Sequence, residues 1–473
     1  MVSGAHAVKE KELLQLGIAR GAPMAAALAA AQAAAQGGMK TREIRKTLRM
    51  IARNPAPFRQ HPQFGALASL LVDGAAPVSC AAPPPGGGAP WRQWGTDLDP
   101  KSIEQMRNAC ALPVSVRGAL MPDAHVGYGL PIGGVLAVRN AVIPYAVGVD
   151  IACRMKLTAL DLPPETLRND LDRLKRAIEA ETRFGVGAEF KVRRRHEVMD
   201  LDWSVSPVTR EHKDKAWAQL GTSGSGNHFV EFGILEIFGE GLGLPPGHYL
   251  ALMSHSGSRG TGALVCEYYS KVAMQQRRDL PSELRHLAWL DLDRHEGREY
   301  WAAMQLMGRY AAANHEIIHR CITRHLGAEV LLDIENHHNF AWKEVHDGET
   351  LIVHRKGATP ADEGVIGIIP GSMASPAYIV GGLGNPESLR SAAHGAGRRI
   401  SRSQAKKTLQ WRDARALLDA RGVTVMSAGL DEVPMVYKDI EEVMAAQADL
   451  VTAVARFHPR LVKMAPAGER PED

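Results

Sequence analysis

The 473-residue sequence contains few cysteines and no apolar run long enough to cross a membrane. The cysteines are odd in number and lie far apart in the chain: Cys80, Cys110, Cys153, Cys266 and Cys321. A disulfide framework is therefore not expected, and a reducing cytoplasm would keep a functional thiol free. We predict a cytoplasmic protein on this basis.

The longest apolar stretch near the N-terminus, residues 24–36, is rich in alanine and too short to span a bilayer. It has the length of a signal-peptide core, but Lys9, Glu10, Lys11 and Glu12 mix charges where a signal peptide is basic. We therefore expect a helix of the folded protein and no membrane partner.

Neither sign of charge dominates, because 56 Lys and Arg residues face 52 Asp and Glu residues for a formal net charge of +4. So small an excess permits a nucleic-acid partner without arguing for one. Hydrophobic residues make up 45% and charged residues 23%, as in ordinary globular proteins. The length suffices for one large domain or two smaller ones, and we expect a monomer.

Proline and glycine mark a boundary along the chain. Residues 81–90 read AAPPPGGGAP, which holds neither a helix nor a central strand and predicts a linker. Residues 1–80 would then form a helical N-terminal extension, with helices at 24–36 and 41–53. Residues 91–473 would form the catalytic domain.

The texture changes after the linker, where short β-rich runs alternate with glycine clusters and with longer helical periodicities. This pattern predicts an α+β domain whose loops carry the chemistry. We expect strands at residues 133–138 and 142–149. We expect helices at residues 163–182, 300–326 and 439–457.

Five short segments carry side chains that bind metals, and in four of them a histidine lies beside glycine, serine or asparagine. They are residues 150–153 (DIAC), 224–228 (GSGNH), 254–260 (SHSGSRG), 336–339 (NHHN) and 393–398 (AHGAGR). One such histidine is more often structural, but four in similar surroundings indicate a site. A thiolate, a carboxylate and several imidazoles suit zinc, manganese, iron or cobalt, and a shared carboxylate or thiolate can serve two ions.

Two of the small-residue turns are typical of phosphate cradles, because glycine and serine expose backbone donors. They are residues 370–373 (PGSM) and 394–398 (HGAGR), where Arg398 could pair with an oxyanion. A neutral His394 could attack an activated phosphorus to give a phosphoramidate. It could equally do no more than hydrogen-bond a phosphate, and the residues alone leave both interpretations open.

Taken together, the motifs resemble the RtcB-type RNA ligases over most of the chain, from Trp94 to Lys463. They occur in the family's order: MPDAHVGYGLPIGGV (121–135), GVDIAC (148–153), GSGNHFVE (224–231), SHSGSRG, HHNF, VHRKGAT (353–359), PGSM, HGAGR and VYKDIEEV (436–443). The resemblance implies an α+β, RtcB-like fold with mixed sheets around a dinuclear metal site. It also implies RNA and GTP as partners and two Mn²⁺ ions per active site.

The implied reaction joins RNA ending in a 2′,3′-cyclic phosphate or 3′-phosphate to RNA with a 5′-hydroxyl, as in RNA repair or tRNA splicing. GTP first guanylylates a histidine, which by motif position is the catalytic His394. The RNA 3′-phosphate then takes the guanylate, giving RNA-(3′)pp(5′)G, and the 5′-hydroxyl displaces GMP.

The resemblance assigns the remaining site residues by motif position. The manganese ligands are Asp150, Cys153, His228, His255 and His338, with Cys153 as the bridging one. The guanylate pocket comprises Asn227, His228, Phe229, Glu231, His338, Asn339, Pro370, Gly371, Ser372, Met373, Ala377, Gly395, Ala396, Gly397, Tyr437 and Lys463. Glu231 can accept paired hydrogen bonds from a guanine edge, which would favour GTP over ATP.

Several positions depart from the family's pattern or need a choice. Arg154 stands where the family usually has glycine, which would place a bulky cation beside the metals. Ala377 stands where relatives often carry serine, and ten residues follow Lys463. Of the paired histidines, His338 matches the ligand, and His337 would then lie behind it as a support.

Two other functions compete with ligation. The segment His315–His319 (HEIIH) satisfies the pattern of zinc peptidases, with Glu316 as the base, although no third ligand is evident nearby. A metal-dependent phosphohydrolase or RNA-end processing enzyme could use the same site if Arg154 has altered the nucleotide pocket. A non-catalytic RNA-binding module is disfavoured because every ligand and the nucleophile are present.

Overall fold

The computed structural model describes residue 8 and residues 10–16, 18, 22–53, 55–73 and 88–469. The chain divides into two compact units, residues 1–82 and residues 83–473. Of the expected linker, residues 81–87 lie outside the described part, and residues 88–90 form neither helix nor strand. The division into extension, linker and catalytic domain stays a prediction.

The first unit is helical in its described part. Its helices are α1 (Glu10–Gln15), α2 (Ala22–Gln36), α3 (Thr41–Arg53) and α4 (Gly65–Asp73), with a 3-10 turn at Ala56–Phe58. The helices expected at 24–36 and 41–53 are therefore confirmed as α2 and α3. Ile44, Leu48 and Ile51 form one fully buried face of α3, as their spacing of three and four residues requires.

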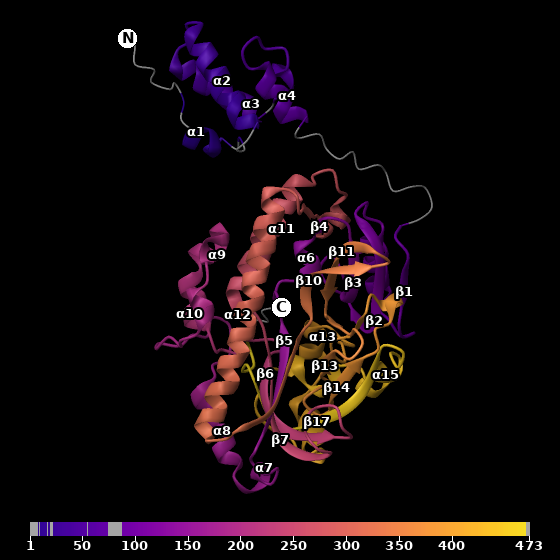
Figure 1. Cartoon of the computed structure of the whole chain (residues 1–473). Coiled ribbons are helices and arrows are strands. Elements are labelled where there is room, and N and C mark those ends of the chain that lie inside the picture. Colours follow the sequence, from indigo (N-terminus) through magenta and orange to yellow (C-terminus); the bar gives the residue numbers. More distant parts are fainter. Residues whose placement is uncertain are drawn as a thin grey trace. The chain divides into compact units, whose positions relative to one another are not determined.

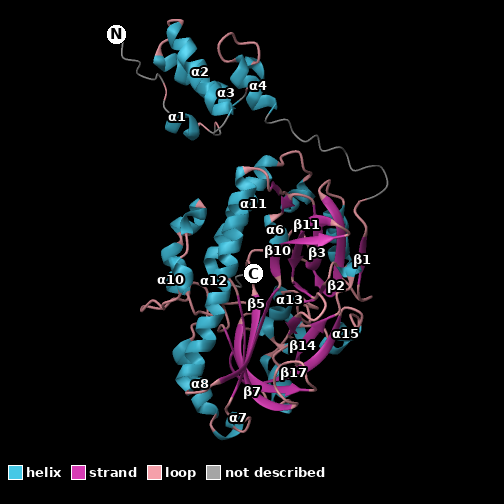
Figure 2. Ribbon diagram, viewed as in Figure 1, coloured by secondary structure: helices cyan, strands magenta, loops and turns pink. Residues whose placement is uncertain are grey.

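The second unit is an α+β structure built on two mixed sheets (Figure 2). The five-stranded sheet has the order β1-β2-β3-β11-β10, in which only β1 and β2 are parallel. Its strands are β1 (Trp91–Gln93), β2 (Ser115–His125), β3 (Ile132–Val138), β10 (Asn339–His346) and β11 (Glu349–Lys356). The expected strand at 133–138 is thus confirmed as β3.

The eight-stranded sheet has the order β13-β14-β17-β6-β7-β5-β9, with β16 paired beside β17. Its strands are β5 (Arg154–Leu160), β6 (Phe229–Ile237), β7 (Gly247–Ser256), β9 (Val330–His337), β13 (Ile366–Ile369), β14 (Ala377–Gly382), β16 (Thr424–Ser427) and β17 (Val451–Met464). Two short pairs complete the strands: β4 (Ala141–Val142) with β8 (Leu290–Asp291), and β12 (Ala358–Pro360) with β15 (Ser391–Ala393).

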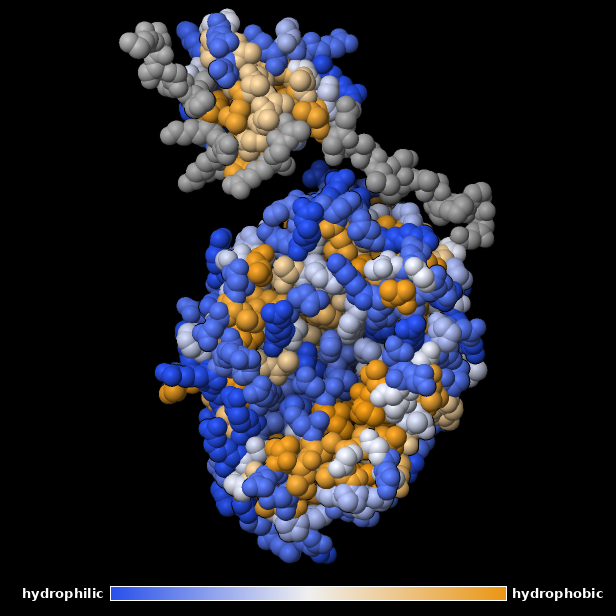
Figure 3. All heavy atoms as spheres, viewed as in Figure 1, coloured by the Kyte–Doolittle hydropathy of each residue, from blue (hydrophilic) through white to orange (hydrophobic). Residues whose placement is uncertain are grey.

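Helices cover one side of the eight-stranded sheet, where the long α12 runs beside α8 and α11 and crosses β5 and β7 (Figure 1). The helices of this unit are α5 (Pro100–Cys110), α6 (Pro144–Val147), α7 (Thr166–Asn169), α8 (Leu171–Glu181), α9 (Pro207–Glu211), α10 (Lys213–Gln219), α11 (Arg259–Gln276), α12 (His295–Leu326), α13 (Arg402–Thr408), α14 (Trp411–Ala420) and α15 (Ile440–Ala445). Among the described residues, no helix combines the length and the apolar character that crossing a membrane requires. Hydrophilic side chains cover most of the visible face of this unit, with apolar ones gathered over β7 and β17 (Figure 3).

Strand alternation in β7 decides which side chains reach which face of the sheet. Leu250 and Leu252 pack with Ile318 and Ile322 of α12, whereas Met253 packs on the opposite face. The same alternation then turns Ser254 toward α12 and His255 toward the opposite face. The period of two therefore places a histidine where a site can form.

Three of the expected elements, those at residues 142–149, 163–182 and 439–457, differ from the structure. The strand expected at 142–149 is wrong beyond Val142, because Pro144 lies in the first turn of α6 and Gly148 ends that helix. The helix expected at 163–182 is two helices, α7 and α8, which meet at Asp170. The helix expected at 300–326 is confirmed within α12.

The helix expected at 439–457 is correct only for its first turns. Asp439 caps α15 by accepting a hydrogen bond from the Glu441 amide, and the helix ends at Ala445. From Val451 the chain forms β17, which pairs with β14 on one side and with β6 on the other. Tertiary pairing decides here, because a short apolar run fits a helix and a buried strand equally well.

Candidate active site

A cavity of about 440 Å³ opens at one end of the eight-stranded sheet, between the strands and the turns that follow β13 and β15. Most of the predicted site residues line it. They are Asp150, Cys153, Asn227, His228, Phe229, Glu231, His255, His338, Asn339, Pro370, Gly371, Ser372, Met373, Ala377, His394, Gly395, Ala396, Gly397 and Tyr437. Lys463 is the predicted residue that does not line this cavity.

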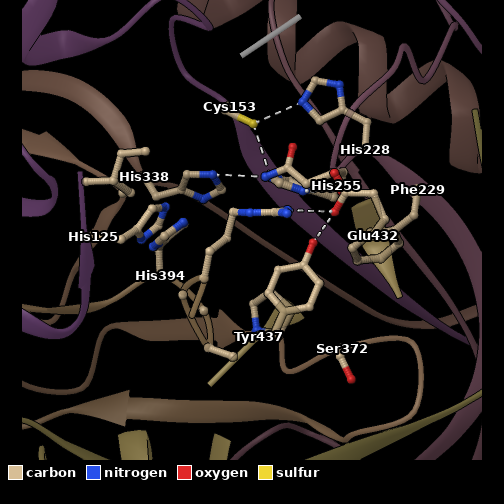
Figure 4. Close-up of a pocket in the computed structure, with 18 of the residues that line it drawn as sticks. His125, Cys153, His228, Phe229, His255, His338, Ser372, His394, Glu432 and Tyr437 are labelled. Carbon is tan, nitrogen blue, oxygen red and sulfur yellow. Dashed lines mark hydrogen bonds and ion pairs between the residues drawn. The ribbon is translucent and has the colours of Figure 1, made fainter. Parts of the chain in front are cut away.

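A thiol and several imidazoles converge in the wall of the cavity (Figure 4), and the carboxylate of Asp150 lies beside them. Cys153 Sγ lies 3.4 Å from His228 Nε2 and 3.1 Å from His255 Nε2. His255 Nε2 lies 3.2 Å from His338 Nε2, and His228 Nε2 lies 3.0 Å from Asp150 Oδ2. Ligands of a single tetrahedral ion with Cys and His donors lie about 3.3–3.7 Å apart, so these donors have the spacing of a metal-binding site.

The strand order explains why residues so far apart in the chain meet. Cys153 directly precedes β5, His228 directly precedes β6, and His255 lies near the end of β7. His338 occupies the position between β9 and β10. Because β6, β7, β5 and β9 are neighbours in the sheet, the four side chains emerge at the same end of it.

Asp150 is fixed by the turn after β7. Its Oδ1 accepts hydrogen bonds from Ser258 N at 2.9 Å and from Ser258 Oγ at 3.2 Å. A side chain at Gly257 would collide with this carboxylate, since a Cβ there would lie 2.1 Å from Oδ1. Residues 257–260 (GSRG) therefore hold the Asp150 carboxylate in place through Oδ1. The other oxygen, Oδ2, faces His228 in the cluster.

The protonation states of the cluster suit a metal ion. Burial, reinforced by the neighbouring His228, lowers the pKa of His255 to about 3, and burial holds the pKa of His338 well below its usual range. Burial alone would raise the pKa of Asp150, but hydrogen bonding and charge from His228, with the charge of Arg259, hold it at about 2. His338 Nδ1 is buried without a hydrogen-bond partner among the described residues. Neutral imidazoles beside an ionised carboxylate are the ligand forms that bind cations.

Hydrogen bonds to the second ring nitrogen, Nδ1, set the orientation of His255 and His228. His255 Nδ1 lies 3.1 Å from the Asn227 carbonyl, to which it donates, and this leaves Nε2 as the lone-pair nitrogen facing the cluster. Arg259 Nη1 lies 3.1 Å from His228 Nδ1 and donates to it. The His228 proton then sits on Nε2 toward Asp150, so an ion bound there would displace it.

His394 stands beside the cluster, with its ring centroid 4.9 Å from that of His338 (Figure 4). Its Nδ1 donates to Asp123 Oδ2 at 2.6 Å, and its backbone amide donates to the same oxygen at 3.2 Å. Asp123 is fully buried. Gly397, with φ of +73°, closes the turn against Asp123, since a Cβ there would lie 2.1 Å from the Asp123 carbonyl oxygen. The arrangement fixes the ring and leaves Nε2 as the acceptor nitrogen.

Asp123 was missed by reasoning from the sequence, although it lies within the MPDAH motif. Its partner is 271 positions away, and no local pattern connects the two. His125 and Lys356 line the same cavity and were missed as well. Burial lowers the pKa of His125 to about 4 and that of Lys356 to about 8. The signal that could have found them is their presence in the motifs at 121–135 and 353–359.

Glu231 and Tyr437 line the same cavity. Glu231 is buried, and no hydrogen bond to its carboxyl group is found among the described residues. Burial raises its pKa well above the usual range. Tyr437 donates its hydroxyl to Glu432, and burial raises the pKa of that hydroxyl. A buried acceptor aimed into a cavity fits a ligand that brings its own N–H donors.

The two predicted phosphate cradles are joined to each other. The Ala396 amide donates to the Pro370 carbonyl at 2.9 Å, so this donor is already used within the protein. Arg398 binds the Asp431 carbonyl at 2.7 Å and lies 3.4 Å from Glu432, with its guanidinium over the Tyr437 ring. We expected the Arg398 guanidinium to be available to bind an oxyanion. In the structure it is instead engaged with Asp431 and Glu432.

Two expectations, those for Arg154 and His337, need correction, and a third residue, Lys463, lies apart from the other predicted site residues. Arg154 does not lie beside the cluster: it points to the opposite face, where it binds Glu335 at 3.0 Å and the Gly308 carbonyl at 3.0 Å. His337 does not support His338, because alternation turns its ring away, and it packs 5.0 Å from Trp342. Lys463 lies 3.6 Å from Glu179 and over Phe184, outside the cavity.

The HEIIH segment does not form a zinc site in the described structure. His315 and His319 lie on the buried face of α12, where both rings bind Ser254 Oγ, at 2.7 and 2.8 Å. Glu316 points outward to His196 and Arg320. The pattern is structural here, and it ties α12 to β7.

An α+β fold with thiol, imidazole and carboxylate groups around one cavity defines a candidate metal-dependent enzyme. A family model described as tRNA-splicing ligase RtcB matches residues 105–205 and 200–464. The chain is 34% identical over 415 residues to RNA-splicing ligase RtcB of Escherichia coli K12, and this alignment covers 77% of the chain and 95% of the E. coli protein. It is 31% identical over 439 residues to tRNA-splicing ligase RtcB of Aeropyrum pernix, covering 76% and 90%. The chain therefore belongs to the RtcB family of RNA ligases.

Proposed function

We propose that this chain is a GTP- and Mn²⁺-dependent RNA ligase that joins 2′,3′-cyclic-phosphate or 3′-phosphate RNA ends to 5′-hydroxyl ends. The reaction runs through guanylylated His394 and an RNA-(3′)pp(5′)G intermediate. One observation carries the proposal beyond family membership: the Asp123–His394 pair, at 2.6 Å, lies in the same cavity as the Cys153 cluster.

In the first step His394 acts as the nucleophile. Because Nδ1 donates to Asp123, the lone pair lies on Nε2. Nε2 attacks the α-phosphorus of GTP, the bond to the bridging oxygen breaks, and pyrophosphate leaves. Asp123 holds the ring in place and stabilises the positive charge that develops on it.

The later steps return His394 to its starting form. An oxygen of the RNA 3′-phosphate attacks the phosphorus of the guanylate, and the phosphorus–nitrogen bond breaks. The RNA 5′-hydroxyl then attacks the 3′-phosphorus, and GMP leaves as the new phosphodiester forms. A cyclic phosphate must first be opened by water to the 3′-phosphate.

Asp150, Cys153, His228, His255 and His338 would hold the two Mn²⁺ ions. When bound, the ions supply Lewis-acid stabilisation of charge on the phosphate oxygens. The donor set fits divalent manganese, zinc and cobalt alike, so the choice of metal depends on supply as well as on the ligands.

Glu231 would select the nucleobase. A carboxylate can accept both N–H donors of a guanine edge, and adenine lacks that pair of donors. The buried Glu231 has no partner of its own among the described residues, so leaving it unpaired would penalise ATP. We expect Glu231→Gln to lower the preference for GTP over ATP by at least about tenfold.

The test is labelling of the full-length protein with α-labelled GTP and Mn²⁺ in the absence of RNA. We expect an acid-labile label that His394→Ala abolishes and that the exposed control His248→Ala retains. The experiment is repeated with Zn²⁺ and Co²⁺. Absence of label with all three metals would overturn the proposal, and release of phosphate from RNA ends without joining would support the phosphohydrolase or RNA-end processing alternative instead.

A further inference from the structure

Tyr128 presents an exposed ring on the wall of the active-site cavity. It is 64% exposed, although it belongs to the short segment between the buried strands β2 and β3. Its ring centroid lies 6.3 Å from that of Tyr145 and 5.8 Å from that of His286, and these two lie 4.9 Å apart in an edge-on arrangement. The three rings, Tyr128, Tyr145 and His286, form an aromatic cluster with one open member.

The segment that carries Tyr128 is held rigidly. The Gln105 side chain donates to the Gly127 carbonyl at 2.6 Å and accepts from the Gly127 amide at 3.1 Å. Lys356 Nζ donates to the Tyr128 carbonyl at 2.6 Å. Gly129, with φ of +71°, fits against the His286 carbonyl, from which a Cβ would lie only 2.6 Å away. An exposed ring on so fixed a backbone loses little conformational entropy when a ligand stacks on it.

The same segment is continuous with the reacting centre. The chain runs from His125 to Tyr128, and both residues line the cavity that His394 also lines. Lys356 is followed by Gly357, where a Cβ would lie 3.1 Å from His394 Cε1. Arg399 lines the cavity as well, is exposed, and has no side-chain ion pair among the described residues. The Tyr128 ring and the Arg399 guanidinium thus line the same cavity as the proposed nucleophile, His394.

We propose that Tyr128, backed by Tyr145 and His286, stacks the unpaired terminal base of an RNA end during joining. The proposal rests on the ligase function proposed above. The Tyr128 ring offers a π-face that every base can use, so the contact tolerates any sequence. Arg399 supplies a cation for the backbone phosphate of the same strand.

The experiment separates the RNA-dependent steps from guanylylation. Full-length Tyr128→Ala, Tyr128→Leu and Tyr128→Trp proteins are compared with Tyr268→Ala, which alters another exposed tyrosine, on α11, that does not line the cavity. Labelling with GTP and Mn²⁺ is measured without RNA, and KM and kcat for joining are measured with RNA. We expect Tyr128→Ala and Tyr128→Leu to take the label normally and to raise KM for RNA about 10-fold to 100-fold. Tyr128→Trp should restore the wild-type KM.

A second arm uses RNA that lacks the terminal base at the 3′-phosphate end or at the 5′-hydroxyl end. With the abasic nucleotide at the stacked end, wild-type protein and Tyr128→Ala should have equal KM values, which also identifies that end. The inference is overturned if Tyr128→Ala joins RNA as wild type does, if it loses the label, or if its defect persists on both abasic substrates. Absence of label on the wild-type protein would instead overturn the ligase function.

Discussion

At the scale of single residues, Asp123 binds the proposed nucleophile His394 through two hydrogen bonds to one oxygen. Asp123 is fully buried, and its Oδ2 accepts from both the ring and the backbone amide of His394. Its other oxygen, Oδ1, has no hydrogen-bond partner in the described part of the chain. A carboxylate placed in this way acts through the ring that it holds, and its removal should affect the tautomer of His394 before it affects the fold.

We predict that Asp123→Asn lowers the rate of His394 guanylylation by about 10²-fold to 10⁴-fold, because an amide can present its NH₂ group and stabilise the wrong tautomer. The rate is measured by rapid-quench labelling with GTP. Asp97→Asn, an exposed aspartate outside the cavity, is the matched control and should label at the wild-type rate. Wild-type labelling by Asp123→Asn would contradict the role assigned to the pair.

At the scale of elements, β7 and α12 share a chain of hydrogen bonds behind the site. His315 Nε2 donates to the Ser256 carbonyl at 3.0 Å, so its Nδ1 accepts from Ser254 Oγ at 2.7 Å. His319 Nε2 then donates to Ser254 Oγ at 2.8 Å, and its Nδ1 lies 2.7 Å from Thr158 Oγ1. The single hydroxyl of Ser254 thus satisfies one nitrogen of each ring.

We predict that Ser254→Ala lowers the free energy of unfolding by about 2 kcal/mol, because it leaves two buried ring nitrogens without a partner. Chemical denaturation monitored by tryptophan fluorescence measures the change. The exposed Ser282→Ala should stay within about 0.5 kcal/mol of wild type. A loss for Ser254→Ala as small as that of the control would show that the hydroxyl does not bind both rings.

The same elements show what could be predicted from the sequence and what could not. The helices at 41–53 and 300–326 were predictable, because in a long segment the spacing of the apolar residues shows both the helix and the face that it buries. β17 was not, since its pairing with β6 and β14 is decided by residues far along the chain. Arg154 and His337 were misplaced for a simpler reason: adjacent strand residues face opposite sides, and the register was unknown.

At the scale of the whole molecule, the fold buries many histidines in the neutral form. Burial lowers the pKa of His125 and His354 to about 4 and that of His337 to about 3. It also holds the pKa values of His315 and His319 well below the usual range. In the unfolded chain these rings take up protons near pH 6.5, so the unfolded state binds more protons than the folded state between about pH 6.5 and pH 4.

We predict that the metal-free protein keeps its full stability above pH 6.5 and loses it steeply as the pH falls toward 4. Each such ring contributes about 1.4 kcal/mol per pH unit within that window. Denaturation at a series of pH values in the presence of a chelator measures the slope. His354→Gln should reduce the slope by the share of one ring, whereas the exposed His248→Gln should leave it unchanged. A flat profile between pH 7 and 5 would contradict the prediction.

The two units also have separate hydrophobic cores. The core of the first unit consists of residues between Val8 and Leu71, among them Leu48 and Phe64, whereas the residues of the candidate site and the hydrophobic clusters around them lie beyond residue 90. Each core is built by its own stretch of chain, so each unit should fold by itself.

We predict that a chain beginning at residue 83 keeps the unfolding midpoint of the main transition and the rate of guanylylation. We also predict that residues 1–82 alone unfold cooperatively. Calorimetry of the full chain should then resolve two transitions, of which the shortened chain retains one. Loss of folding or of labelling in the shortened chain would mean that the helical unit completes the catalytic one.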